Sequence, residues 1–515
     1  MFLAGCILLF LSYLLSFVLS SIYTSKSLKL PPSPFKLPII GNLHQLGSLP
    51  HRKLQLMSKT HGPLMFLHFG CKPVLIVSSI AAVCEITKNH DQAISNRYET
   101  SFGKKISYNN KNIGFAPYGH YWSMMRKFSI FHLVSMKKAP SVRSVMEEET
   151  TILTEKIQRL ISYATPALPT ILNLSDIFMI LTNDIICRMA IGQKYNGEAD
   201  CTPRFKLMFQ EIGNLLGTFN IADFIPWLGW VNFINGLEKR MEKAFVEIDI
   251  FLDTVIQQHR IEYKKKDYQN NAADIDLVDV LLQIERERTF DICLWNDNIK
   301  AILSDMFGVG TNPTSILLEW TMAEILKHPE VKKEVQEEVR GVTRGKENIA
   351  DVDIKQMQYL NAVIKETLRL HPPLPLLIPR KLTKNVNIQG FEVPAKTMVI
   401  FNAWAIGRDP VFWDEPEKFK PERFLNDAYF GFNGYTDFYV IPFGIGRREC
   451  PCAEFAFDIV KLVIANLLHK FDWSLPWGMS GEDLDMTEAT GISSHLKYPL
   501  QALVTPKNFC GPPTT

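Results

Sequence analysis

Cys450 lies in a short segment whose residue types and spacing suit a thiolate bound to a metal. The segment reads Pro442-Phe443-Gly444-Ile445-Gly446-Arg447-Arg448-Glu449-Cys450-Pro451-Cys452-Ala453. Its glycines allow the backbone to turn tightly against a flat partner. The apolar segment from Ala453 onward is predicted to be a helix, and the dipole at its N-terminus favours the thiolate form of Cys450. A thiolate in a tight turn beside arginines suits an iron porphyrin, because the porphyrin's propionates are anionic.

The spacing Phe443-x-x-Gly446-x-Arg448-x-Cys450 resembles the heme-binding loop of cytochromes P-450. The resemblance implies that heme b (iron protoporphyrin IX) is the cofactor and that Cys450 is the axial ligand of its iron. It also implies that Phe443, Gly446 and Arg448 contact the heme. The alternative is a buried structural cysteine in a turn that contains arginines.

The composition is that of a globular protein. The chain has 515 residues, of which 46% are hydrophobic and 21% are charged, so a large core is expected and disorder is not. The net charge of +2 gives no reason to expect a nucleic-acid partner. The nine cysteines are dispersed, which argues against a disulfide framework and for a reducing compartment.

The N-terminus is predicted to anchor the chain in a membrane. Phe2 to Tyr23 is uncharged and mostly apolar, and a helix of this length spans a hydrocarbon core of about 30 Å. Lysines follow at once, so the domain after the anchor is expected in the cytosol. The sequence therefore predicts an anchor over residues 1–25, a basic, proline-rich hinge over residues 26–42 and a catalytic domain over residues 43–515. A cleaved signal peptide is the alternative.

Trp122 and Arg126 lie four residues apart, so on a helix they share one face. A Trp N–H and an Arg guanidinium can both bond a carboxylate such as a heme propionate. Because this segment resembles the family's C-helix, the resemblance implies that both residues bind a propionate. Arg380 is a further candidate for that role. The alternatives are a core Trp beside a surface Arg, and a plain surface Arg at position 380.

Most of the chain is predicted to be helical. Leu64 to Phe69 and Val74 to Ser78 predict a β-hairpin, whereas about Glu147 to Leu282 and Asn298 to Lys327 show helical periodicity. The resemblance covers about Pro31 to Pro506. It implies a mostly α fold, the cytochrome P-450 fold, with a smaller β-rich lobe near the N-terminus and one transmembrane helix before it.

Glu366 and Arg369 have a spacing that permits an ion pair on a helix, and Arg423 is a possible third member. These three residues, in this order before the cysteine loop, resemble the ion-pair triad that holds the core together in this family. We therefore expect these residues to be structural rather than catalytic.

The predicted helix Asn298 to Lys327 departs from the family pattern at two adjacent positions. The family has an acid where this chain has Asn312 and an alcohol where it has Pro313. The family's pair helps to deliver protons, but an amide does not relay protons readily and proline has neither hydroxyl nor N–H. Thr311 and Thr314 are nearby and can hold water, so Thr311, Asn312 and Thr314 are the candidate catalytic residues. Pro313 is also expected to widen a kink in the helix.

A further departure is Cys452, which stands where the family nearly always has glycine. If φ at this position is positive, the side chain costs about 1 kcal/mol or more. Cys450 remains the predicted ligand because it alone is in register with Phe443, Gly446 and Arg448.

The resemblance is to plant A-type monooxygenases of specialised metabolism. It implies oxidation of a small apolar terpenoid, alkaloid or phenylpropanoid with dioxygen, at the endoplasmic reticulum membrane, and NADPH–cytochrome P-450 reductase as the electron donor. Aromatic residues in the loops Tyr98 to Phe115 and Phe219 to Trp230 predict an apolar cavity, and the alternative for the second loop is that it faces the membrane. Basic residues expected to face the reductase are Lys127, Lys137, Lys138, Arg447 and Arg448.

Three other outcomes are compatible with the two departures. The enzyme can form a product by cyclisation or desaturation instead of hydroxylation. It can be an isomerase or dehydratase that needs no reductase. It can also be a heme-binding homologue without catalytic activity.

Overall fold

The computed structural model describes residues 28–138, 140–163, 170–194, 201–265, 276–287, 295–344, 346–347, 349–425 and 439–507. The predicted anchor, Phe2 to Tyr23, lies outside these ranges. Among the helices of the described ranges, none combines the length and the apolar composition needed to cross a bilayer.

The β-rich part is built around a five-stranded sheet of order β1-β2-β8-β5-β3. Strands β1 (Leu64–Phe69) and β2 (Lys72–Val77) form the predicted antiparallel hairpin, and β8 (Met398–Phe401) runs parallel to β2. Strand β3 (Asn96–Arg97) pairs with β5 (Arg380–Lys381), with Arg97 opposite Arg380. The smaller sheets contain β4 (Ile171–Asn173), β10 (Gln501–Pro506) and β9 (Phe471–Ser474), and β6 (Val386–Ile388) with β7 (Phe391–Val393).

Helices make up most of the rest of the described chain. Those near the β-rich part are α2 (Pro50–His61), α3 (Ile80–Ile94), α4 (Ser101–Ile106) and α17 (Ala403–Ile406). Those that follow α4 are α5 (His120–Lys138), α6 (Pro140–Ser162), α7 (Leu174–Ile191), α8 (Cys201–Gly217), α9 (Ile221–Phe224), α10 (Val231–Ile234), α11 (Leu237–Lys265) and α12 (Leu277–Glu287). The remaining helices are α13 (Asn296–Lys327), α14 (Pro329–Thr343), α15 (Asp351–Gln356), α16 (Gln358–Leu370) and α18 (Ala453–Lys470). The mostly α fold with a small β-rich part is therefore confirmed.

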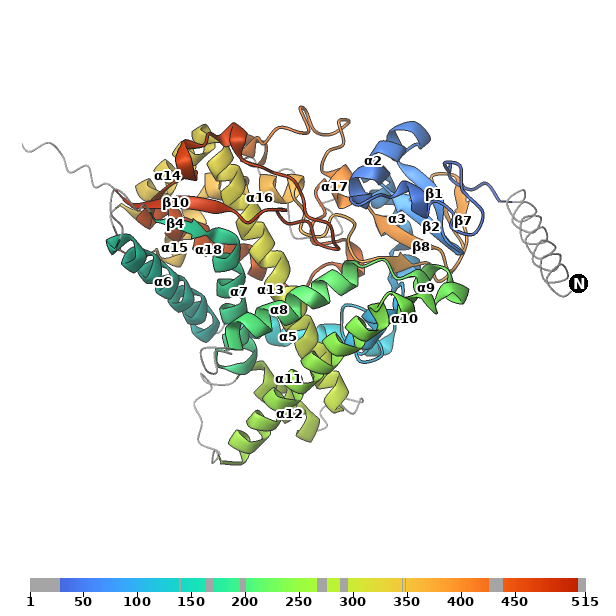
Figure 1. Cartoon of the computed structure of the whole chain (residues 1–515), viewed down its shortest axis with the longest axis horizontal. Helices are drawn as coiled ribbons and strands as arrows, with labels where there is room; N and C mark the ends of the chain where they lie inside the picture. The colour runs from blue at the N-terminus through green and yellow to red at the C-terminus, as the bar shows by residue number, and fades with distance from the viewer. Residues whose placement is uncertain are drawn as a thin grey trace, which may run out of the picture.

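Helix α13 runs through the middle of the molecule, with the sheet on one side and most helices on the other (Figure 1). Its C-terminal half packs in the largest apolar core with α7, α16 and α18. Its N-terminal half belongs to a second core with α8, α11 and α12. Pro313 cannot supply the N–H that the Val309 carbonyl would accept in a regular helix, yet α13 continues through it to Lys327.

Candidate functional site

Cys450 lies between a 3₁₀ turn, η4 (Gly446–Arg448), and the first residues of α18. Its N–H donates to the carbonyl of Phe443 at 2.8 Å, which closes the loop. Gly446 has a φ of +57°, a conformation that glycine adopts without strain. The loop therefore places Cys450 at the N-terminus of a helix, as the sequence predicts.

Several groups act on the Cys450 thiol. Burial raises its pKa, while a hydrogen bond from the N–H of Cys452 and the charge of Arg126 lower it. The net direction of the pKa shift is upward. A cation bound to the sulfur would favour the thiolate form.

Cys452 is accommodated without backbone strain. It is the N-cap of α18 and has a φ of −111°, which is outside the left-handed region. The condition for a strain penalty at this position is therefore not met.

The arginines and the tryptophan predicted to bind propionates come together around the cysteine loop. Arg126 donates to the carbonyl of Glu449, and Arg380 donates to that of Ile445, both at 2.7 Å. Trp122 Nε1 donates to the carbonyl of Ile113 at 3.2 Å. Arg448 is buried and donates to three carbonyls, those of Ser95, Ile113 and Ala116.

Arg97 is a fourth arginine in this cluster, and the sequence analysis missed it. It is 8% exposed and donates to the carbonyls of Gly114 and Ile378 at 2.8 Å. Burial lowers its pKa, and the charges of the other three arginines lower it further. Burial and the charges of Arg380 and Arg126 likewise lower the pKa of Arg448 to about 9. Only the pairing of β3 with β5 brings Arg97 to Arg380, so no local sequence signal marks it.

Asp305 of α13 is a second residue that the sequence did not indicate. Its carboxylate accepts from Asn112 Nδ2 at 2.6 Å and from the N–H groups of Ile113 and Gly114 at 2.7 and 3.1 Å. Burial raises its pKa to about 6, although these hydrogen bonds and Arg97 oppose the rise. Segment 112–116 is thus held by α13 on one side and by the arginines on the other.

One face of α13 carries an exposed apolar side chain. The side chain of Val309 is 47% exposed although α13 lies at the centre of the molecule (Figure 1). Pro313 follows one turn later and shares this face. Asn312 points towards α8, where a Cβ on Gly213 would lie 3.4 Å from its Nδ2.

Thr311 and Thr314 of α13 are both buried but differ in their contacts. Thr314 Oγ1 donates to the carbonyl of Gly310 at 2.9 Å. Thr311 is 4% exposed, and within the described ranges its Oγ1 has no hydrogen-bond partner. It lies four residues after Phe307, whose ring contacts Phe209 and Phe251. Thr311 therefore lies on the packed side of the helix, and a catalytic role for it remains a prediction.

The predicted ion-pair triad of Glu366, Arg369 and Arg423 is present. Arg369 Nε pairs with Glu366 Oε2 at 2.6 Å, and Arg423 Nε lies 3.5 Å from Glu366 Oε1. Both members of the first pair are fully buried. The three residues thus join α16 to the segment that contains Arg423, as expected.

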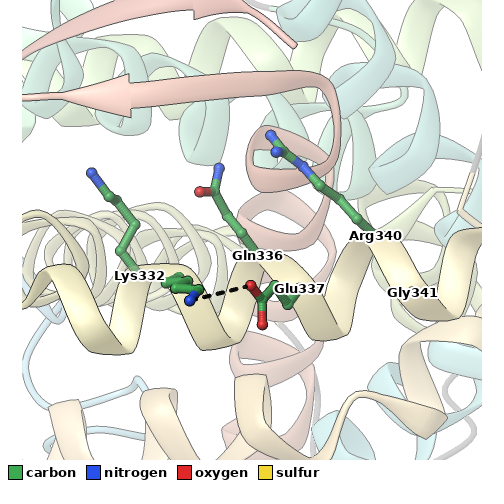
Figure 2. A pocket seen from close by; sticks show the side chains of 6 residues that line it. Lys332, Gln336, Glu337, Arg340 and Gly341 are labelled. Atoms are coloured by element: carbon green, nitrogen blue, oxygen red, sulfur yellow. Dashed lines mark ion pairs between the residues drawn. The ribbon is translucent and has the colours of Figure 1, made fainter. Parts of the chain in front are cut away.

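A separate hollow of about 540 Å³ lies along α14 (Figure 2). Its cations already have partners: Lys332 donates to the carbonyl of Trp473, Arg340 pairs with Asp472, and Lys333 pairs with Glu337. It contains none of the residues discussed above, and we assign no function to it.

Known proteins resemble this chain over nearly its whole length. The family model described as "Cytochrome P450" matches residues 31–501. "Cytochrome P450 736A117" of Prunus mume is 46% identical over 97% of this chain and 94% of the relative. "Norfluorocurarine oxidase" of Strychnos is 44% identical over 94% of both chains. The solved structure "Zebra fish cytochrome P450 another structure with Progesterone" has a TM-score of 0.74 and 25% identity, over 89% of this chain and 99% of that one.

The residues around Cys450 fit heme b. The cysteine loop offers a sulfur ligand, and the cluster of Arg97, Arg126, Arg380 and Arg448 leaves positive charge that two propionates would neutralise. The chain belongs to the cytochrome P450 family, whose members are heme b monooxygenases.

Proposed function

We propose that this enzyme oxidises a small apolar plant metabolite, using dioxygen and electrons that NADPH–cytochrome P-450 reductase supplies. The observation that carries the proposal is the gathering of four arginines around the loop that presents Cys450. Bound heme supplies the chemistry that activates dioxygen. In this proposal Cys450 provides the sulfur ligand, and Arg97, Arg126, Arg380 and Arg448 hold the anionic edge of the heme.

The face of α13 that exposes Val309 supports an apolar substrate. Its exposed side chain is the isopropyl group of Val309, and Phe102 and Ile106 of α4 belong to the same apolar core as the N-terminal half of α13. One relative is named as an oxidase of norfluorocurarine, and a solved neighbour is named with progesterone. Both are small molecules, which agrees with a terpenoid, alkaloid or phenylpropanoid substrate.

An exposed apolar surface supports attachment to the endoplasmic reticulum membrane. Trp227, Trp230, Phe233 and Ile234, which are 54–76% exposed, lie close together in the chain around α10. The adjoining Phe224 accepts a hydrogen bond from Cys71 in the β1–β2 turn, so this surface adjoins the β-rich part. Exposed aromatic side chains suit the interface of a bilayer. We propose that this surface lies on the membrane to which residues 1–25 anchor the chain.

The proposed reductase surface differs from the one predicted from the sequence. Arg448 is 5% exposed and its guanidinium bonds to internal carbonyls, so it is not available to a partner. The prediction that Arg448 faces the reductase is therefore wrong, because that charge lies inside the loop. Lys127 and Arg447 are exposed and remain candidates.

The proposal is tested by expressing the full chain in microsomes with and without a plant reductase. Terpenoids, alkaloids and phenylpropanoids are then screened by mass spectrometry, with Cys450→Ala as the control. Oxygenated products that require both NADPH and reductase would support the proposal. Conversion at the same rate without reductase would instead show an isomerase or dehydratase.

The predicted anchor has a separate test. Protease added to intact microsomes is expected to digest the catalytic domain. Full protection, or a mature chain that begins after Tyr23, would contradict the predicted topology.

A further inference from the structure

The last turn of α3 contacts the loop that presents Cys450, although the two are more than 350 residues apart in the sequence. Asp91 of this turn is 8% exposed. Its Oδ1 accepts from the backbone N–H of Arg447 at 3.3 Å, and its Oδ2 pairs with Arg447 Nε at 3.1 Å. A single carboxylate thus holds both the main chain and the side chain of one loop residue.

Gly446 makes this contact possible. A Cβ at position 446 would overlap Asp91 Oδ1, and the φ of +57° disfavours any side chain there. The glycine in the cysteine loop therefore has a role besides turn formation, because it lets the Asp91 carboxylate reach the backbone of the loop.

Two further contacts attach α3 to the same loop. Arg448 Nε donates to the carbonyl of Ser95, the C-cap of α3, at 2.7 Å. A carbonyl at a helix C-terminus carries partial negative charge, so it is a favourable acceptor for a guanidinium. Below these polar contacts, Ile441 and Ile445 of the loop share an apolar core with α3. The loop is thus fixed at Arg447 and Arg448, just before Cys450.

We propose that Asp91 is a positioning residue for the thiolate ligand. It fixes the backbone at Arg447, so that the turn from Gly446 to Glu449 delivers the Cys450 sulfur to the start of α18 in one orientation. Without the carboxylate, the N–H and the guanidinium of Arg447 lose a buried partner, and the loop gains alternatives in which the sulfur moves away from the iron. The inference rests on Cys450 as the ligand and does not depend on the substrate.

The test compares Asp91→Asn and Asp91→Ala with a matched control, Glu85→Ala. Glu85 is also on α3, and its carboxylate also accepts a backbone N–H, that of Gln389 at 2.9 Å, but this contact is exposed and does not involve the loop. The measurement is the rate, in mild urea, at which the red-shifted Soret band of the ferrous–carbonyl protein is lost. Far-UV circular dichroism of the same samples follows unfolding of the whole chain.

Asp91→Ala is expected to lose the band about tenfold to a hundredfold faster than wild type, which is the effect of a charged hydrogen bond to a buried partner. Asp91→Asn keeps an oxygen that can accept the N–H of Arg447, so its rate is expected in between. Arg447→Ala keeps that N–H and is also expected to lie in between. Glu85→Ala is expected to match wild type within about twofold, as for other exposed contacts.

Two outcomes would overturn the proposal. In the first, Asp91→Ala loses the band at the rate of Glu85→Ala. In the second, the band and the dichroism of Asp91→Ala decay together, which would show that Asp91 serves general stability. An Asp91→Ala chain that folds but contains no thiolate-ligated heme would support the proposal.

Discussion

Arg369→Lys is expected to lower the free energy of unfolding by about 3–5 kcal/mol, because lysine keeps the positive charge but leaves at least two buried acceptors without a donor. The Arg369 guanidinium donates to both oxygens of Glu366, at 2.6 and 2.7 Å. It also donates to the carbonyls of Gly407, Pro416 and Lys418 at 2.6–3.0 Å. These hydrogen bonds use all five N–H groups of a guanidinium, whereas a lysine ammonium has about three and no planar fork. At least two buried acceptors would therefore lose their donor.

This decrease in the free energy of unfolding corresponds to a measurable decrease in melting temperature. An unfolding entropy of about 2.1 cal/mol/K per residue gives about 1.1 kcal/mol/K for a chain of 515 residues that unfolds as one unit. A loss of about 3–5 kcal/mol then lowers Tm by about 3–5 °C. Calorimetry measures this shift, and the ferrous–carbonyl spectrum reports whether the heme is retained.

A matched control is Lys333→Ala, which removes an exposed pair to Glu337 at 3.9 Å. This control is expected to change stability by less than about 0.5 kcal/mol. If Arg369→Lys changed stability no more than the control, the buried pair would not be the bond that joins α16 to the segment of Arg423.

Three further predictions follow from the site and from one buried ion pair. Cys450→Ala is expected to abolish the red-shifted Soret band of the ferrous–carbonyl protein, and Cys452→Ala is expected to keep it; the reverse pattern would exclude Cys450 as the ligand. The double change Asn312→Asp with Pro313→Thr is expected to favour simple hydroxylation over cyclisation or desaturation. Mass spectrometry identifies the product, and the ratio of product formed to NADPH consumed measures the coupling. If neither changes, Asn312 and Pro313 do not alter the reaction. His259 donates to the carbonyl of Val255 and pairs with Asp276 at 2.9 Å. Burial lowers the pKa of His259, but these two contacts outweigh it and raise the pKa to about 9. Its stabilisation is therefore complete below the usual pKa of about 6.5 and is lost as pH rises through about 9, so the urea midpoints of wild type and His259→Gln are expected to converge between those values.

Local patterns allowed much of the fold and site to be predicted. Two runs of residues that favour strands indicate the hairpin of β1 and β2, and the apolar run after Ala453 indicates α18. The i,i+4 spacing places Arg126 over the Trp122 ring at 5.5 Å. In each case the interacting residues are close in the sequence, so the local pattern determines their relative position.

Contacts between distant segments could not be predicted in the same way. Arg97 reaches the site because β3 pairs with β5, and Asp305 because α13 passes segment 112–116. The backbone conformation of Cys452 likewise depends on how the loop enters α18. The spacing of residues in the sequence does not predict these contacts, because they depend on how whole helices and strands pack against one another.

The four arginines that meet near Cys450 also bear on how the protein is made. A chain synthesised while heme is scarce gathers four guanidinium groups in its interior, with the Asp305 carboxylate as a nearby negative charge. Mutual repulsion in a medium of low dielectric opposes closure of this region. In such a chain this region is unfolded for a larger fraction of the time, so the chain is cleaved by proteases more readily. We therefore expect the amount of this protein in a cell to depend on the supply of heme as well as on the rate of translation.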